Sequence, residues 1–173
     1  MKKAVVFLLL ILAIAACRQK EEPKPQSLSP DRIRFENDMR LLQETVKKDP
    51  KNLDALINLG NMLMDSSRFD EAIDAYQRAL SLEPKNVDVR VDMGICYRNS
   101  GKPDIAVKEF RKAVEINPNH LNAHKNLAVV LAYDLKENTQ AIKEFEKSLK
   151  LSPSAPDAER IKQEIQKLKA SKK

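Results

Sequence analysis

The stretch "NLGNMLMDSSRFDEAIDAYQRALSLEPKN", from Asn58 to Asn86, decides the fold of this chain. Apolar and small residues recur in it at helical spacing, first before the polar segment Asp65–Arg68 and again after it. Pro84 follows the second run, and proline cannot continue a helix because it lacks a backbone N–H. The stretch therefore predicts two helices joined by a short turn.

The same layout returns further along the chain. "FDEAIDAYQRALSLEPKN" begins at Phe69, and its counterpart "PDIAVKEFRKAVEINPNH" begins 34 residues later at Pro103. A third copy reaches its aromatic residue one residue late, which we interpret as an insertion in the turn at 134–139. A fixed period of this length predicts stacked helix pairs, here at 53–86, 87–120 and 121–155.

The positions shared by the three copies resemble the tetratricopeptide repeat. A large residue is followed by a small one in the first helix, and two small residues, an aromatic residue and a proline mark the second. The resemblance covers 53–155 and implies an all-α solenoid of about three helix-turn-helix repeats. The composition agrees, with 42% hydrophobic and 32% charged residues and only three glycines. The departures from the pattern include Arg90 and His124 at the fourth position of their repeats.

Additional helices are predicted at both ends of the array, because a repeat cannot bury its apolar face alone. In 30–52, a helix with Ser29 as its N-cap and Pro30 in its first turn resembles the second helix of a degenerate repeat. In 156–173, a capping helix begins after Ser154 and Asp157, which suit a capping box. The apolar stripes of these two helices are Phe35, Met39, Leu42 and Val46 in the first, and Ala158, Ile161, Ile165 and Leu168 in the second.

The N-terminus has the features of an export signal. "MKKAVVFLLLILAIAAC" combines two lysines, a short apolar run and small residues before Cys17, which predicts a signal peptide over 1–16. Its ending, Ile14–Cys17, resembles the bacterial lipobox. That resemblance implies that Cys17 becomes the acylated first residue of the mature protein. The stretch after it has charges, two prolines and almost no apolar residues, which predicts a flexible tether over 17–29. Arg18, not aspartate, follows Cys17, and the resemblance therefore also implies anchoring in the outer membrane, facing the periplasm.

The resemblance further implies a groove that binds a partner peptide or helix. In the family, defined positions of each first helix face the concave side of the stack. The residues at these positions that we expect to contact a partner are Ile57, Asn58, Asn61, Met64, Val91, Ile95, Arg98, Lys125, Asn126, Val129 and Tyr133. A clamp for a C-terminal carboxylate, as in chaperone-docking members, is incomplete because Ile57 stands where that subfamily has lysine.

These features predict a membrane-anchored adaptor that mediates protein–protein interactions in the bacterial envelope. Two alternatives are a pilotin-like assembly factor for a secretin or type IV pilus, and a self-associating structural protein without a peptide ligand. We expect no enzyme, no cofactor and no metal site, because His120 and His124 have no third ligand at a suitable spacing. Nucleic acid is not expected as a partner, since no basic stripe with aromatic platforms is present. Cys96 is expected to be a small buried apolar residue.

Overall fold

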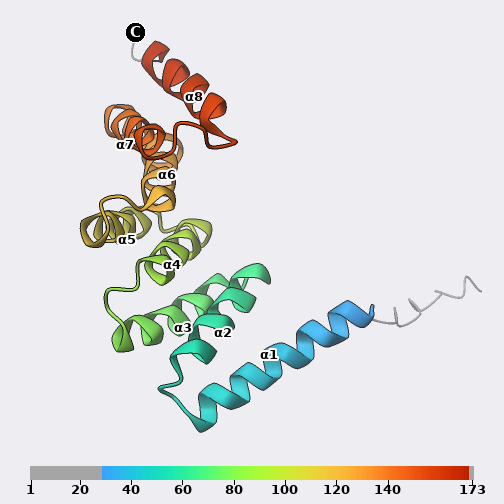
Figure 1. The fold of residues 1–173 in the computed structure, drawn as a ribbon. Helices are drawn as coiled ribbons and strands as arrows, with labels where there is room; N and C mark the ends of the chain where they lie inside the picture. Colours follow the sequence, from blue (N-terminus) through green and yellow to red (C-terminus); the bar gives the residue numbers. More distant parts are fainter. Residues whose placement is uncertain (1–28, 172–173) are drawn as a thin grey trace, which may run out of the picture.

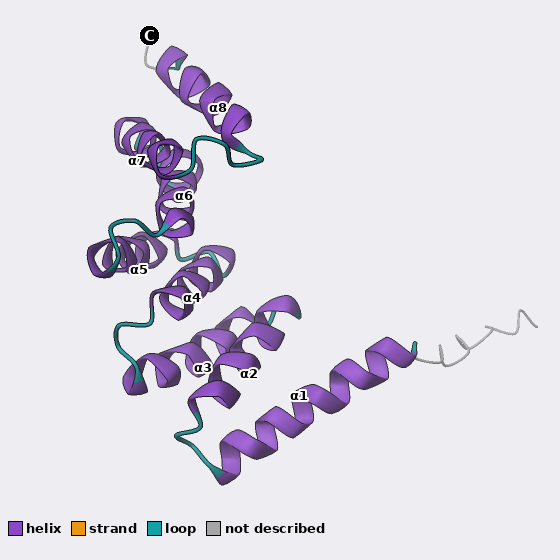
Figure 2. Ribbon diagram, viewed as in Figure 1, coloured by secondary structure: helices purple, strands orange, loops and turns teal. Residues whose placement is uncertain are grey.

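The computed structural model describes residues 29–171, in which the chain forms α-helices, one π-helical turn and short loops, and no strand (Figures 1 and 2). The expected all-α solenoid is therefore confirmed. The predicted signal peptide, Cys17 and all of the tether except Ser29 lie outside the described residues. The elements are α1 (Pro30–Lys48), α2 (Leu53–Asp65), α3 (Phe69–Leu82), α4 (Val87–Asn99), α5 (Pro103–Ile116), α6 (Leu121–Val129), η1 (Val130–Asp134), α7 (Asn138–Leu151) and α8 (Ala158–Ala170).

The first helix of each repeat begins with the same kind of cap. Asn52 and Asn86 accept hydrogen bonds through their side chains from the backbone nitrogens of the residues three positions on, at 3.0 and 3.1 Å. His120 does the same at the start of α6, where its Nδ1 accepts from the backbone N–H of Ala123 at 3.1 Å. Each cap satisfies a backbone donor that the first turn of a helix leaves without an intrahelical partner.

In the first two repeats, a buried aromatic ring of the second helix packs against a glycine of the first helix. Tyr76 of α3 and Phe110 of α5 are fully buried. A Cβ added at Gly60 would lie 2.5 Å from Cε1 of Tyr76, and one at Gly94 would lie 2.5 Å from Cε1 of Phe110. Both distances are far too short, so glycine is needed where the two helices of these repeats approach each other most closely.

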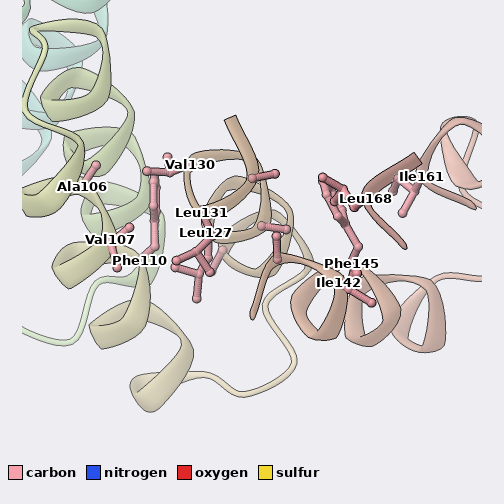
Figure 3. Close-up of a cluster of buried hydrophobic side chains, with 14 of the residues drawn as sticks. Ala106, Val107, Phe110, Leu127, Val130, Leu131, Ile142, Phe145, Ile161 and Leu168 are labelled. Carbon is pink, nitrogen blue, oxygen red and sulfur yellow. The ribbon is translucent and has the colours of Figure 1, made fainter. Parts of the chain in front are cut away.

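The terminal helices extend the core at both ends of the stack. Met39 and Val46 of α1 are buried in the cluster that also holds the first repeat. Ile161 and Leu168 of α8 pack with Ile142 and Phe145 of α7, in a cluster that continues through α6 to α5 (Figure 3). The predicted apolar stripe of the C-terminal helix is therefore buried as expected.

The extra residue of the third repeat lies in a helix and not in the turn where the sequence analysis placed it. The three turns, 66–68, 100–102 and 135–137, have the same length. The additional residue is taken up by η1, where backbone bonding widens to a π-helical turn after α6. The middle residue of each turn has a positive φ, which is 59° at Ser67, 76° at Gly101 and 60° at Lys136.

The expected capping box before α8 is absent. Asp157 occupies the N-cap position but makes no side-chain hydrogen bond to the backbone of the first turn. Its carboxylate instead accepts a hydrogen bond from Nζ of Lys125 at 2.8 Å. A charged partner on the neighbouring α6 has replaced the local bond.

Arg90 and His124, which depart from the repeat pattern at the fourth position, make equivalent hydrogen bonds in their two repeats. Arg90 is buried, and it bonds both Oε2 of Glu109 at 2.6 Å and the carbonyl oxygen of Pro84 at 2.8 Å. His124, also buried, bridges a carboxylate on α7 and the carbonyl of Pro118 in the same way, at 2.6 and 3.0 Å. Each residue joins the end of the preceding repeat to the second helix of its own repeat.

Candidate partner-binding site

A pocket of about 570 Å³ opens between α6, η1 and α8, at the C-terminal end of the array. This volume lies in the range of sites that bind small molecules or a few side chains of a peptide. The residues that line it are Asn122, Lys125, Asn126, Val129, Tyr133, Phe145, Asp157, Arg160, Ile161 and Glu164. Four of them, from Lys125 to Tyr133, belong to the groove expected from the sequence.

The apolar part of the pocket comes from four side chains on different elements. Phe145 and Ile161 are buried where α7 meets α8, and Val129 is half-buried at the end of α6. Tyr133 in η1 keeps 43% of its surface exposed. The pocket therefore offers an aromatic face and an aliphatic side chain to an incoming group.

Ion pairs and hydrogen bonds fix most of the charged side chains around the pocket. Glu164 accepts from Nζ of Lys167 at 2.7 Å and also from the hydroxyl of Tyr133. The hydrogen bond from Lys125 lowers the pKa of Asp157, and those from Lys167 and Tyr133 lower the pKa of Glu164. Both carboxylates are therefore ionised at neutral pH, and a lysine already balances the charge of each.

Arg160 differs from the other charged residues of the pocket. Its side chain is 77% exposed, and its ion pair within the described residues is a long one, with Nη2 at 3.9 Å from Asp157. An exposed pair at this distance contributes little energy, so the guanidinium can bind another acceptor at little cost.

Other predicted groove residues are engaged within the array. Asn61 accepts a hydrogen bond from the hydroxyl of the buried Tyr76 at 2.7 Å. Ile57 and Met64 are half-buried against the core of the first repeat, while Asn58 is exposed. The Asn61 bond explains why position nine of this repeat is polar: the second and third repeats have phenylalanine in place of tyrosine, and apolar residues at that position.

The predicted groove residues of the second repeat are also buried or paired within the array. Val91 is only 4% exposed and lies in the core, because α4 and α6 contact each other there. Ile95 is half-buried against the same core. Arg98 forms an ion pair with Asp134 of the next repeat, with Nε 2.6 Å from Oδ2. Val91 is therefore not available to a partner, and Arg98 is already paired.

An acidic region lies on the same helix, α4. Burial first, and then the nearby Asp88 and Asp65, raise the pKa of Asp92 to about 6, while His120 opposes this shift. Burial and the neighbouring Asp92 raise the pKa of the Cys96 thiol to about 12. Cys96 is fully buried, so the thiol is an inert core group, as expected.

The contribution of α8 to the pocket was missed in the sequence analysis. Asp157, Arg160 and Glu164 come from the predicted capping helix, which was given only a packing role. Their spacing of three and four residues places them on one helix face beside Ile161, and this pattern could have indicated a second surface of the helix. What the sequence lacks is the placement of that face opposite α6.

Residues 29–171 contain neither a candidate metal site nor a candidate membrane-spanning helix. No group of three or more histidine, cysteine, aspartate or glutamate side chains in this range is arranged to hold a metal ion. Within the same range, no helix has both the length and the apolar composition needed to cross a bilayer.

Comparison with known proteins identifies the repeats. Two family models described as "Tetratricopeptide repeat" match residues 63–128 and 125–154, which together make up more than half of the chain. No curated protein sequence matches the chain.

Solved structures share the fold at low sequence identity. "Crystal structure of MamA" superposes with a TM-score of 0.74 at 22% identity, over 80% of this chain and 78% of that one. "First TPR of Spaghetti (RPAP3) bound to HSP90 peptide SRMEEVD" gives 0.64 at 24% identity, over 71% and 94% of the two chains. The solved structures show the fold, and the two family models, which agree with the repeat spacing and the helix stacking, show that this chain belongs to the tetratricopeptide repeat proteins.

Proposed function

We propose that this chain is an adaptor that binds a segment of another protein, with the pocket between α6, η1 and α8 as the main point of contact. The observation that carries the proposal is the pocket itself. It combines a volume of about 570 Å³ with an exposed tyrosine and an exposed arginine, side chains that are enriched at protein interfaces. Tetratricopeptide repeats are typically scaffolds for protein–protein interactions rather than enzymes.

The bound segment is expected to be internal to the partner chain. The RPAP3 structure contains an HSP90 peptide, so this type of repeat can hold a peptide. In the present chain, Ile57 and Val91 stand where the carboxylate clamp of chaperone-docking repeats needs polar or basic groups, and Val91 is buried. Recognition of a free C-terminus by such a clamp is therefore disfavoured, and side-chain recognition in the pocket is favoured.

We further propose that the adaptor is held at a bacterial outer membrane through acyl chains on Cys17. The lipobox-like sequence Ile14–Cys17 and the following Arg18 support this proposal. Each acyl chain adds about 0.8 kcal/mol per buried CH₂ group, so two or three chains give stable anchoring. The twelve residues between Cys17 and Pro30 could span roughly 40 Å, which would let the array reach partners in the periplasm.

Anchoring can be tested by mass spectrometry and fractionation in a bacterial host. The mature protein should begin at Cys17 with a mass increase that corresponds to acylation, and it should sediment with membranes. Cys17→Ser should move the protein to the soluble fraction, whereas Cys96→Ser, a matched change at the other cysteine, should leave it on the membrane. A mature protein with unmodified Cys17 would refute the anchor and leave the binding proposal intact.

Partner binding can be tested by site-specific photo-crosslinking in cells. A photoreactive residue at Tyr133 lies in the pocket, and one at Leu82 provides a matched control on the second helix of another repeat, with similar exposure. A discrete crosslinked product with a second protein from Tyr133 but not from Leu82 would support the adaptor. A product of twice the chain mass would indicate self-association instead. Equal labelling from both positions, or none, would count against a partner site at the pocket.

A further inference from the structure

The side chains of the pocket indicate the chemistry of what it binds. We propose that the pocket accepts one bulky apolar side chain of the partner segment, and that an acidic residue beside it pairs with Arg160. This inference rests on the adaptor function proposed above and adds the class of segment that the adaptor selects.

The apolar half of the proposal follows from the ring of Tyr133. Its hydroxyl is bonded to Glu164 of α8, while 43% of the residue remains exposed. The ring is thus held in place before any partner arrives, and an aromatic group fixed in advance binds at a smaller cost in side-chain entropy. Val129 beside it and the buried Ile161 and Phe145 beneath complete a surface that suits an aromatic or long aliphatic side chain.

The acidic half follows from a comparison of the charges that line the pocket. Asp157 and Glu164 already accept close hydrogen bonds from lysines, at 2.8 and 2.7 Å. A basic partner would have to compete with these lysines. Arg160 has only its 3.9 Å contact, and a guanidinium can bind a carboxylate through two parallel hydrogen bonds. The cation is the charge most available to a partner, so the pocket favours an acidic segment.

The remaining lysines of α8 do not change this balance. Lys162 pairs with Glu159 at 2.6 Å and Lys169 pairs with Glu146 at 3.1 Å. Neither lysine lines the pocket. Lys162 therefore provides a matched control: it is a cation on the same helix, also exposed, which lies outside the site.

The experiment uses the absence of tryptophan from this chain, which allows the fluorescence of a tryptophan-containing peptide to report binding directly. Two heptapeptides blocked at both ends carry one tryptophan, followed in one by two glutamates and in the other by two lysines. A third peptide has serine in place of tryptophan next to the glutamates and is used as an unlabelled competitor. Anisotropy is measured at low salt with the unaltered chain, with Arg160→Glu and with Lys162→Glu, after circular dichroism has shown that each variant is folded.

The expected result is a preference for the glutamate peptide over the lysine peptide of about fivefold, which is the upper range for one exposed ion pair. Arg160→Glu should abolish or invert the preference, and Lys162→Glu should change it by less than about twofold. The serine peptide should fail to compete. Equal or tighter binding of the lysine peptide, no binding of either, or an unchanged preference in Arg160→Glu would overturn the inference.

The crosslinking experiment separates this inference from the function on which it rests. A specific product from Tyr133 without a preference for the acidic peptide would refute the selectivity and leave the adaptor function standing. Failure of both experiments would refute both.

Discussion

Replacing Arg90 by leucine should destabilise the fold strongly, and adding Glu109→Ala should restore most of the loss. The first repeat supplies the template for this experiment. At the positions equivalent to Arg90 and Glu109 it carries Leu56 and Ala75, and both are buried in its core. One chain thus contains a charged and an apolar version of the same contact.

The magnitude follows from the burial of the pair. The side chains of Arg90 and Glu109 are 8% and 17% exposed, and Nη1 lies 2.6 Å from Oε2. Removing one member of a buried pair costs about 3–5 kcal/mol, because the other charge is left without compensation. Since Glu109 retains some contact with water, we expect about 3 kcal/mol for Arg90→Leu.

The double variant should lose much less. Nε of Arg90 is buried without a hydrogen-bond partner in residues 29–171, so the native arrangement already carries a cost that leucine removes. The carbonyl of Pro84 loses its bond to the guanidinium, which should cost about 1 kcal/mol. A net loss of about 1 kcal/mol lies well below the sum of the losses expected for the two single variants, because Glu109→Ala alone also leaves a buried charge without its partner, so the two positions are strongly coupled.

The coupling energy is measured by urea unfolding of the unaltered chain, Arg90→Leu, Glu109→Ala and the double variant, followed by far-ultraviolet circular dichroism. The exposed pair Lys102–Asp70, at 2.8 Å, is the control, and its cycle should give less than about 1 kcal/mol. If the loss in the double variant equals the sum of the two single losses, the pair does not act as one unit and the reasoning is refuted.

Three further predictions concern single residues. Ser67→Gly should raise the free energy of unfolding by roughly 1 kcal/mol, because serine holds a φ of 59° there; an unchanged urea midpoint would contradict this. Gly94→Ala should lower it by about 1–3 kcal/mol through the 2.5 Å approach to Phe110, and an unchanged melting temperature in calorimetry would show that the ring can move aside. Asp92→Asn should remove a pH dependence of the free energy of unfolding. Burial and Asp88 raise the pKa of Asp92 from 3.8 to about 6 in the folded state, so between these values the folded chain binds a proton that the unfolded chain has released. The unaltered chain should therefore lose stability relative to the variant as the pH rises through this range. Parallel stability curves for the two proteins from pH 4 to pH 7 would rule out this effect.

The stacking of the helices could be predicted from the sequence because it depends on local size. Gly60 precedes Tyr76 by the same interval that separates Gly94 from Phe110, and each glycine is the residue that its ring requires. Such pairs are visible as a period in the sequence. The fold class was therefore available before the structure.

The pocket could be predicted only in part, because it depends on contacts between repeats. The bond between Lys125 and Asp157 joins residues 32 positions apart, and nothing in the local sequence distinguishes it from a capping aspartate. Val91 was expected to contact a partner in the groove because its repeat position faces the concave side in the family, and packing between α4 and α6 buries it. The extra residue before α7 was assigned to a turn because sequence spacing shows that a residue has been added but not how the backbone accommodates it.

The π-helical turn η1 lets the chain accommodate an added residue without changing how the helices after it pack on the array. One residue added to a regular helix would rotate everything beyond it by about 100°, and α7 and α8 would then no longer match the rest of the stack. Confining the added residue to Val130–Asp134 leaves the downstream helices in register and reorients only the side chains of that turn, Tyr133 among them. A one-residue deletion there would redirect Tyr133 at the pocket, but it would also move Val130, Leu131 and Ala132, which are buried in the core. A change of partner through the length of this turn would therefore carry a cost in packing.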